Sequence, residues 1–529
     1  MTRTAASVVV AAVMFSAALV VAAQPPSTEV DQLRRAALAA LARARAAAEK
    51  SGSPVLREVT LPSIERLVQD ADLRRANVTV KERDAAFVRE TLKTARAYAD
   101  RVAAGDDPYR GATGVMVKAY RADWDQTLQP YALYVPRNFD PAKRWPLIVS
   151  LHGAYSNPLH NLRRVFGLDN RPGETDEEAA RNPLPLPDVP ALVVSPFGRG
   201  ELMGWDGLGE DDVMRVIADV RRAYNIDAAR MTLTGLSMGG GGTWAIGLRH
   251  PEMFAALAPV CGTTDFVSTI PPSELPFYDV PRLQALSPPA IAENAAHVQV
   301  MIFHGADDPT VPVEDSRKMA ARYRALGWLG KNVSYTEYPG VKHDAWIPAY
   351  KDAALLRKLA GIRRDPAAPK GPLSPPPAGQ AIPGRFGKSV PRQHPHLYVY
   401  GTHGAPDAVA AARALAQALA DWGPMVAARF TVKADRDVTA ADRARFDLVL
   451  VGAAPFNALA PAVVDGAAAR APLGDRAFRA LVADAAAPSK FVLVFGAATP
   501  AGFARLRRFA VPNRDHPAPE SNRAFVEVP

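Results

Sequence analysis

At 529 residues, the chain is long enough for roughly two to four domains and a sizeable core. Its apolar and charged fractions, 48% and 22%, exclude a disordered chain and one with many membrane spans. The net charge of +9 is spread along the chain rather than gathered in blocks, so nucleic-acid binding is not expected.

Residues 1–23 have the pattern of a signal peptide. Arg3 lies in a short polar start, an apolar run follows, and small residues precede Gln24. Cleavage after Ala23 predicts an exported protein, periplasmic or secreted, and a retained membrane anchor is the alternative. No later stretch is long and apolar enough to span a bilayer.

Residues 24–110 are predicted to form a helical N-terminal extension. Between residues 28 and 105, apolar residues recur at three- and four-residue spacing, most clearly in residues 30–50 and 82–102. This spacing is typical of amphipathic helices. Nothing in the segment has the pattern of a metal or cofactor site.

Residues 111–362 alternate short β-branched runs with helical segments. The expected helices include residues 211–225 and 315–327. The expected strands are residues 131–135, 146–153, 191–196, 231–235, 256–262, 298–305 and 333–339. This alternation predicts an α/β domain with a mostly parallel sheet covered by helices on both faces. Such sheets carry their chemistry on loops at the carboxyl ends of the strands.

A proline-rich segment, residues 363–396, is predicted to be an extended linker. Beyond it, residues 397–529 show a smaller α/β pattern that resembles a flavodoxin-like or Rossmann-like unit. Because this segment lacks a G-x-G-x-x-G motif, we expect a structural or substrate-docking domain rather than a dinucleotide site.

The pentapeptide Gly235-Leu236-Ser237-Met238-Gly239 follows a predicted strand and precedes a predicted helix. This G-x-S-x-G context is that of a nucleophile elbow, in which a sharp turn exposes the serine hydroxyl. Side chains two positions before and after Ser237 would collide with neighbouring backbone, which explains the two outer glycines. Alternatively, the segment is a tight turn with an incidental serine.

Two later strand ends supply the groups that a serine nucleophile needs. Asp307 and Asp308 follow one predicted strand, and His343 follows the next. An imidazole must take the serine proton, and a carboxylate must orient and stabilise that imidazole. The order serine, acid, histidine is the one that α/β-hydrolases use. Spacing alone does not separate Asp307 from Asp308.

The predicted strand before His152-Gly153 ends in a loop upstream of the elbow. In this arrangement the loop provides one oxyanion donor, and the residue after the nucleophile provides the other. We therefore expect the backbone N–H groups of Ala154 and Met238 to form the oxyanion hole. His152 is expected to shape the loop rather than to titrate in catalysis.

Candidate pocket residues are Tyr155, Phe277, Tyr278 and Trp346. Trp346 follows His343 by three residues.

The acids Glu210, Asp211 and Asp212 are expected to cap a helix rather than to bind a cation. Because Cys261 is the single cysteine, an intramolecular disulfide is excluded, and a buried structural thiol is expected.

Residues 111–362 resemble the α/β-hydrolase superfamily. Within it they are similar to esterases of the polyhydroxybutyrate-depolymerase and feruloyl-esterase type, and to predicted peptidases of the prolyl oligopeptidase family. The segment from Leu233 to Gly262 carries most of the resemblance, with support from "FHGADDPTVP" and "GVKHDAW". The resemblance implies Ser237 as nucleophile, His343 as base and Asp308, in the pattern H-G-x-x-D-x-x-V-P, as the acid.

The predicted function is that of an exported serine hydrolase that cleaves small or polymer-linked carboxylic esters without metal or organic cofactor. A serine peptidase acting on peptides is the alternative within the same chemistry. Full peptidases of the prolyl oligopeptidase family usually carry a β-propeller, whereas this chain shows no blade-like repeat, which favours the esterase. A hypothesis of another class is a non-catalytic polysaccharide- or wall-binding protein on a hydrolase fold.

Overall fold

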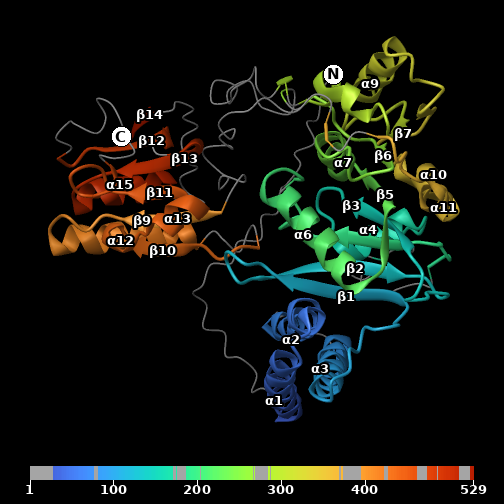
Figure 1. The fold of residues 1–529 in the computed structure, drawn as a ribbon. Coiled ribbons are helices and arrows are strands. Elements are labelled where there is room, and N and C mark those ends of the chain that lie inside the picture. The colour runs from blue at the N-terminus through green and yellow to red at the C-terminus, as the bar shows by residue number, and fades with distance from the viewer. Residues whose placement is uncertain are drawn as a thin grey trace, which may run out of the picture.

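The computed structural model describes residues 28–76, 82–170, 174, 186–202, 204–265, 267, 284–285, 287–368, 371–372, 395–421, 427–460, 474–484, 487–510 and 525–528. A group of helices, an eight-stranded sheet and a six-stranded sheet follow one another along these residues (Figure 1). The predicted signal peptide and most of the predicted linker lie outside the described residues, so the domain boundaries stay predictions.

The helices that precede the first described strand are α1 (Thr28–Ser51), the π-helical turn η1 (Leu56–Thr60), α2 (Leu61–Ala76) and α3 (Glu82–Ala103). They bury small and aliphatic side chains against one another, among them Ala37, Leu41 and Leu92. The expectation of helices between residues 28 and 105 is confirmed. No helix in the described part of the chain has the length and apolar character needed to cross a membrane.

The larger sheet has the strand order β1-β2-β4-β3-β5-β6-β7-β8. Its strands are β1 (Gly114–Arg121), β2 (Leu128–Val135), β3 (Trp145–Leu151), β4 (Leu192–Pro196), β5 (Ile226–Leu236), β6 (Ala256–Val260), β7 (Gln299–Gly305) and β8 (Val333–Tyr338). β2 is antiparallel to both β1 and β4, and all the remaining neighbours are parallel. The mostly parallel sheet is therefore confirmed. β1 was not among the predicted strands.

Helices cover both faces of this sheet, as predicted. They are α4 (Pro158–Val165), α6 (Leu208–Ala223), α7 (Met238–Arg249), η3 (Pro288–Ala295), α9 (Glu314–Ala325), α10 (Trp346–Tyr350), η4 (Lys351–Ala353) and α11 (Ala354–Gly361). Side chains alternate between the faces along a strand: on β3, Leu147 and Val149 join the core under α6, α7 and α9, whereas Ile148 joins the core under α4, α10 and α11.

A second, smaller sheet has the order β10-β9-β11-β13-β12-β14. Its elements are β9 (His396–Tyr400), α12 (Pro406–Ala420), β10 (Thr431–Ala434), η6 (Asp435–Asp437), α13 (Ala440–Arg445), β11 (Asp447–Val451), β12 (Ala477–Asp484), β13 (Ala487–Gly496), α15 (Pro500–Ala510) and β14 (Phe525–Val528). β10, β9, β11 and β13 are parallel to one another. β12 is antiparallel to both of its neighbours, β13 and β14. A smaller C-terminal α/β unit is thus confirmed.

The N-terminal helices pack on the outer strand β1. Ser63 of α2 accepts a hydrogen bond from the backbone N–H of Ala119 at 3.1 Å, and its own hydroxyl donates to Val59 O at 2.7 Å. Arg222 of α6 pairs with Glu58 at 2.9 Å. These contacts attach the helical extension to the edge of the sheet that lies farthest from β8.

Lys118 on β1 is a buried cation between the helices and the sheet. Its ammonium group lies 4.2 Å from the centre of the Tyr109 ring. Burial lowers the pKa of Lys118 to about 8, although the charges of Asp219 and Asp107 act in the opposite direction. The protonated side chain is therefore less stable in the folded protein than in the unfolded chain.

Replacing Lys118 by methionine is expected to remove a pH-dependent part of the stability. Between the folded pKa of about 8 and the unfolded pKa of about 10.4, only the unfolded chain holds the proton, so stability rises with pH. Relative to the Lys118→Met variant, the wild type should gain about 2 kcal/mol in unfolding free energy from pH 8 to pH 10. Urea unfolding at both pH values measures this gain.

The matched control is Lys143→Met, because the Lys143 side chain is 73% exposed. This substitution should leave the pH dependence of the unfolding free energy unchanged. If the wild type and the Lys118→Met variant differed by the same amount at both pH values, the lysine would hold its proton in the folded protein and the burial argument would be wrong.

Candidate active site

Ser237 occupies a strained turn between β5 and α7. Its backbone has φ of 55° and ψ of −120°, a conformation that non-glycine residues rarely adopt and that marks functional sites. A Cβ at Gly235 would lie 2.4 Å from Gly239 O, and one at Gly239 would lie 2.0 Å from Leu151 O. The turn therefore requires glycine on both sides of the serine, for the steric reason expected from the sequence.

His343 lies between Ser237 and Asp308. Its Nε2 is 2.8 Å from Ser237 Oγ, and its Nδ1 is 2.8 Å from Asp308 Oδ2. Because a carboxylate only accepts hydrogen bonds, Nδ1 carries the proton and Nε2 is free to accept from the serine hydroxyl. This tautomer is the one in which the imidazole can take the proton of Ser237.

The carboxylate of Asp308 is fully buried and is held by backbone donors. Its Oδ1 accepts from the N–H groups of Thr310 at 2.8 Å and Val311 at 3.0 Å. Asp307, in contrast, is exposed, and its backbone N–H donates to Val341 O. Of the two acids that spacing left open, the structure thus brings Asp308 to His343.

Close packing holds the loops after β7 and β8 together. A Cβ at Gly305, the last residue of β7, would lie 2.0 Å from Lys342 O, so only glycine fits there. The next residue, Ala306, donates its backbone N–H to Tyr338 O at 3.0 Å. The acid and the histidine therefore come from loops with a defined relative position.

A second histidine, which the sequence analysis did not single out, also contacts Asp308. His304 Nε2 lies 3.2 Å from Asp308 Oδ2 and 3.0 Å from Val311 O, and Nδ1 lies 2.7 Å from Ser316 Oγ. Burial lowers the pKa of His304, so the neutral ring donates from Nε2. This histidine is the first residue of the pattern H-G-x-x-D-x-x-V-P, which was the available signal, although the sequence analysis assigned it no role.

The loop after β3 lies directly against the nucleophile. A Cβ at Gly153 would come within 2.8 Å of Leu236 Cδ1 and 3.4 Å of Ser237 Cβ. The backbone N–H of Ala154 has no hydrogen-bond partner among the described residues, and Met238 opens α7, where N–H groups lack a partner within the helix. That these two N–H groups form the oxyanion hole stays a prediction.

His152 is fully buried in this loop. Its Nδ1 lies 2.8 Å from Gly153 O and its Nε2 lies 3.0 Å from Phe197 O. Burial lowers the pKa of His152. A buried, neutral ring that donates to one of these backbone carbonyls agrees with the expectation that His152 shapes the loop.

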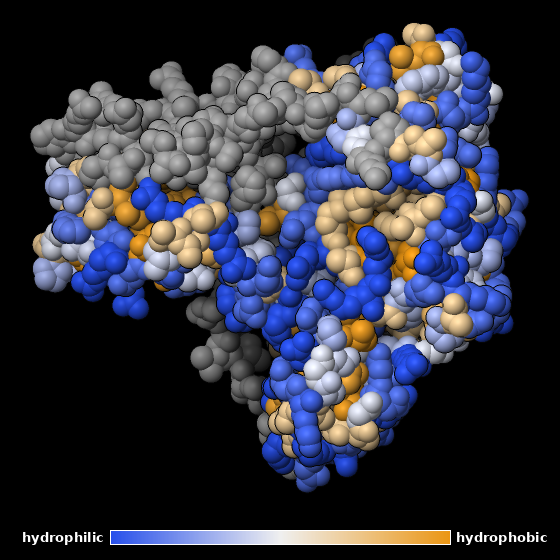
Figure 2. Space-filling view, in the orientation of Figure 1, coloured by the Kyte–Doolittle hydropathy of each residue, from blue (hydrophilic) through white to orange (hydrophobic). Residues whose placement is uncertain are grey.

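Of the candidate pocket residues, Trp346 contacts His343, and Tyr155 lies in the loop after β3. The ring centres of Trp346 and His343 are 5.5 Å apart, edge to face, and Tyr155 is 69% exposed. Leu202 and Ile347, next to these loops, are also exposed. Phe277 and Tyr278 lie outside the described residues. Figure 2 shows hydrophobic side chains gathered over α4 and the strands beside it.

Cys261, Asp308 and His343 place potential metal-ligand atoms within 4.8 Å of one another. However, Ser237 and Asp308 already engage both nitrogens of His343. Burial also raises the pKa of the Cys261 thiol strongly, which disfavours the thiolate that metals require. The group is therefore better suited to proton transfer than to metal binding, and Cys261 is buried as expected.

Glu210 and Asp211 lie in the first turn of α6, as expected of acids at a helix start, but the prediction of a side-chain cap is wrong. α6 does begin at this point, but it has no side-chain cap. Instead, Glu210 pairs with Arg249 at 2.5 Å, and the buried Asp212 accepts from Tyr120 Oη at 2.5 Å and from the N–H of Gly198 at 2.8 Å. The carboxylates of Glu210 and Asp212 thus bind groups distant in the sequence instead of the N–H groups at the start of α6.

Comparison with known proteins agrees with this geometry. Residues 205–361, which contain Ser237, Asp308 and His343, match the model of the prolyl oligopeptidase family. The match covers less than half of the chain, and together with the strand order and the elbow it agrees with the predicted α/β-hydrolase fold.

Individual relatives cover only part of the chain. A bifunctional acetylxylan esterase/xylanase from Neocallimastix patriciarum is 30% identical over 153 residues, which are 28% of this chain and 20% of the relative. The chain thus spans about one fifth of the length of that curated relative. Among solved structures, a thermostable esterase is 28% identical with a TM-score of 0.33, covering 47% of this chain and 63% of that chain. A ferulic acid esterase is 17% identical with a TM-score of 0.36, covering 46% and 98%.

Proposed function

We propose that the protein is a serine hydrolase that cleaves carboxylic esters through an acyl-enzyme. One observation carries the proposal: a single imidazole lies 2.8 Å from both a serine hydroxyl and a buried carboxylate. A serine hydroxyl is a weak nucleophile until such a base takes its proton. The strained turn at Ser237 supports a role beyond packing.

In the first half of the reaction, Ser237 Oγ attacks the ester carbonyl carbon and its proton passes to His343 Nε2. The carbonyl π bond opens, and the oxyanion accepts hydrogen bonds from the N–H groups of Ala154 and Met238. His343, then doubly protonated, is stabilised by Asp308 and gives its Nε2 proton to the departing alcohol. The acyl group remains bonded to Ser237.

In the second half, a water molecule replaces the alcohol. His343 takes one proton from the water as its oxygen attacks the acyl carbon, and the same two N–H groups hold the second oxyanion. The C–O bond to Ser237 then breaks, and His343 returns the proton to the serine. The carboxylic acid leaves, and the enzyme regains its starting state.

The proposed substrates are esters on plant polysaccharide or on polyester. The partial relative named as an acetylxylan esterase/xylanase supports an ester carried by a polysaccharide. The exposed hydrophobic side chains of Tyr155, Leu202 and Ile347 support a broad apolar surface around the site rather than a narrow charged pocket.

A serine peptidase of the prolyl oligopeptidase type is the second candidate, because residues 205–361 match that family's model. The same groups can attack an amide. The N-terminal extension, however, consists of the helices α1 to α3 where full peptidases of the family usually carry a propeller, which favours the ester.

Export is also part of the proposal. The pattern of residues 1–23 supports cleavage after Ala23. A mature protein beginning at Gln24, measured by mass spectrometry of the N-terminus, is the expected result. An intact N-terminus on a membrane-bound protein would favour the anchor instead.

The test of the proposed function is a matched pair of chromogenic substrates with the same acyl group, a p-nitrophenyl ester and a p-nitroanilide. We expect the purified protein to turn over the ester and not the anilide. A fluorophosphonate should label Ser237 in parallel. Preference for the anilide would favour the peptidase, and inert protein that takes no label would favour a non-catalytic binding role.

A further inference from the structure

The six-stranded C-terminal unit shares its hydrophobic core with the larger sheet. Trp124, in the turn between β1 and β2, and Leu208, at the start of α6, belong to the core cluster formed mostly by residues from β9 onward. Trp124 stacks on Phe430 with ring centres 5.9 Å apart. The two units therefore meet through a buried apolar contact, which a domain attached only by a flexible linker would not make.

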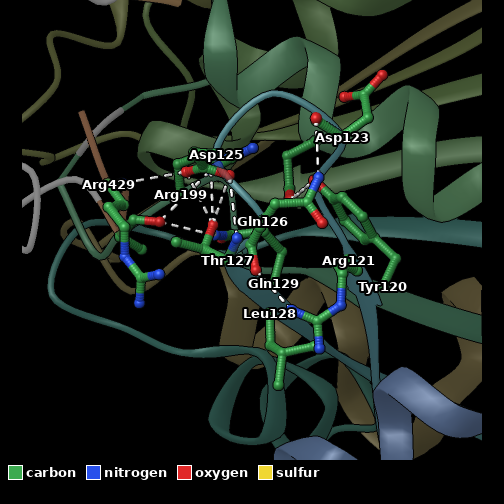
Figure 3. A network of polar contacts seen from close by, with 12 residues as sticks. Tyr120, Arg121, Asp123, Asp125, Gln126, Thr127, Leu128, Gln129, Arg199 and Arg429 are labelled. Atoms are coloured by element: carbon green, nitrogen blue, oxygen red, sulfur yellow. Dashed lines mark hydrogen bonds and ion pairs between the residues drawn. The ribbon is translucent and has the colours of Figure 1, made fainter. Parts of the chain in front are cut away.

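A buried ion pair lies at this junction (Figure 3). Arg199 Nη1 is 2.9 Å from Asp125 Oδ2, and both side chains are fully buried. The C-terminal unit contributes backbone groups: the N–H of Arg429 donates to Asp125 Oδ2 at 3.2 Å. Ala427 O accepts from Gln129 Nε2 at 2.7 Å and from Arg199 Nη1 at 3.4 Å. A buried pair of this kind needs all its partners in place, since an unpaired buried charge is strongly destabilising.

Arg199 belongs to a strained loop that follows β4, the Arg199 loop (residues 197–202). Arg199 has φ of 65°, between Gly198 at 62° and Gly200 at 149°. Such a conformation in a bulky residue persists only where the surroundings impose it. The guanidinium, which lies 4.8 Å from the centre of the Trp124 ring, and its ion pair supply that restraint.

The Arg199 loop in turn holds the loop that carries the proposed oxyanion donor. Glu201 O accepts from the backbone N–H of Tyr155 at 3.0 Å, and Phe197 O lies 3.0 Å from His152 Nε2. Gly153 and Ala154 are the two residues between His152 and Tyr155. A further bond holds the Arg199 loop itself: Asp212 accepts from the backbone N–H of Gly198 at 2.8 Å. The contacts thus run without a gap from Ala427 to the neighbours of Ala154.

The crevice where an α/β unit usually binds ligands is filled in the C-terminal unit. The strand order changes direction between β9 and β11, and ligands bind at such points. Phe456 is buried there, and a Cβ at Gly401 or Gly404 would come within 2.6 Å of its ring. This packing supports a structural role for the unit over a ligand-binding one.

We propose that Arg199 is a positioning residue through which the C-terminal unit holds the Ala154 loop against Ser237. The inference rests on the proposed function, since it assigns a consequence to the oxyanion donor. The C-terminal unit is then part of the catalytic assembly, although it contributes no group that touches substrate. Its attachment to the Arg199 loop determines the position of the Ala154 N–H relative to the oxyanion.

The test is the double substitution Arg199→Met with Asp125→Asn, which removes both charges of the pair together. Complete loss of an oxyanion donor lowers the rate by about 10²–10³, so displacement of one donor should lower kcat by roughly 10-fold. KM for the aryl ester should stay unchanged. The inhibition constant of a trifluoromethyl ketone, which adds to Ser237 and forms an oxyanion, should rise by the same factor.

The pH profile of kcat/KM should keep its shape, because His343 and Asp308 stand on other loops. The matched control is Arg445→Met with Asp123→Asn. That pair also joins the two units, at 3.8 Å, but it is exposed, and its removal should change none of these quantities. Circular dichroism confirms that each variant is folded at the assay temperature.

Full kcat and unchanged inhibition in the folded Arg199 double variant would overturn the inference. If that variant does not fold, Gln129→Met removes the 2.7 Å bond to Ala427 O without touching a charge. It should lower kcat and weaken inhibition together by a few-fold, and unchanged values would again overturn the inference. A wild-type protein without Ser237-dependent activity would overturn the proposed function itself, whatever the variants do.

Discussion

Replacing Ser237 by alanine is expected to lower kcat/KM for an aryl ester by roughly 10⁵-fold or more. The variant loses the oxygen that forms the acyl-enzyme, whereas His343 and Asp308 remain hydrogen-bonded to each other. Alanine has no hydroxyl to leave unpaired, so stability should change little. Release of p-nitrophenol, measured with equal amounts of folded protein, gives the ratio.

The control for this substitution is Ser334→Ala, because Ser334 is an exposed serine on β8 away from the three groups. It should retain wild-type activity and fluorophosphonate labelling. Undiminished turnover by Ser237→Ala would mean that the strained turn serves architecture alone, and the proposed mechanism would be wrong.

Asp308→Asn is expected to lower kcat by about 10⁴-fold. The amide of asparagine can donate to His343 Nδ1, which moves the imidazole proton to Nε2. His343 then faces Ser237 with a donor instead of an acceptor and cannot take the hydroxyl proton. The loss should appear in kcat more than in KM, because the substrate surface is unchanged.

Asp307→Asn provides the matched comparison one residue earlier. Asp307 is exposed, so its substitution should change kcat less than twofold. The opposite ranking, with Asp307 essential and Asp308 dispensable, would contradict the acid assignment. Equal and small effects would show that His343 works without a carboxylate partner.

Most of the larger sheet could be predicted because a buried parallel strand is a local pattern. The runs at residues 146–153, 191–196 and 298–305 are mostly apolar and end at turn residues, as expected of strands buried on both faces. β1 escaped prediction because it is only partly buried and carries Lys118. Its strand character depends on pairing with β2 and on the cover from α2.

The three groups of the candidate site were predictable from their order, because each follows a strand end and parallel strands end at one edge. Asp308 was separated from Asp307 through the family resemblance, and the structure agrees by bringing Asp308 to His343. The loops that support the site were not predictable. Asp212 and Arg199 gain their contacts from residues far away in the chain, whereas His304 pairs with Asp308 only four residues later.

The sequence by itself determined the fold class, the serine at a glycine-flanked turn and the type of chemistry, nucleophilic attack by a serine. These depend on short-range patterns and on steric limits within a few residues. Only the tertiary structure decided where Asp212 and Arg199 pair and what the C-terminal unit contacts. Those outcomes depend on burial. A charge removed from water takes the best partner that the packed chain offers, and sequence spacing does not specify which residue that is.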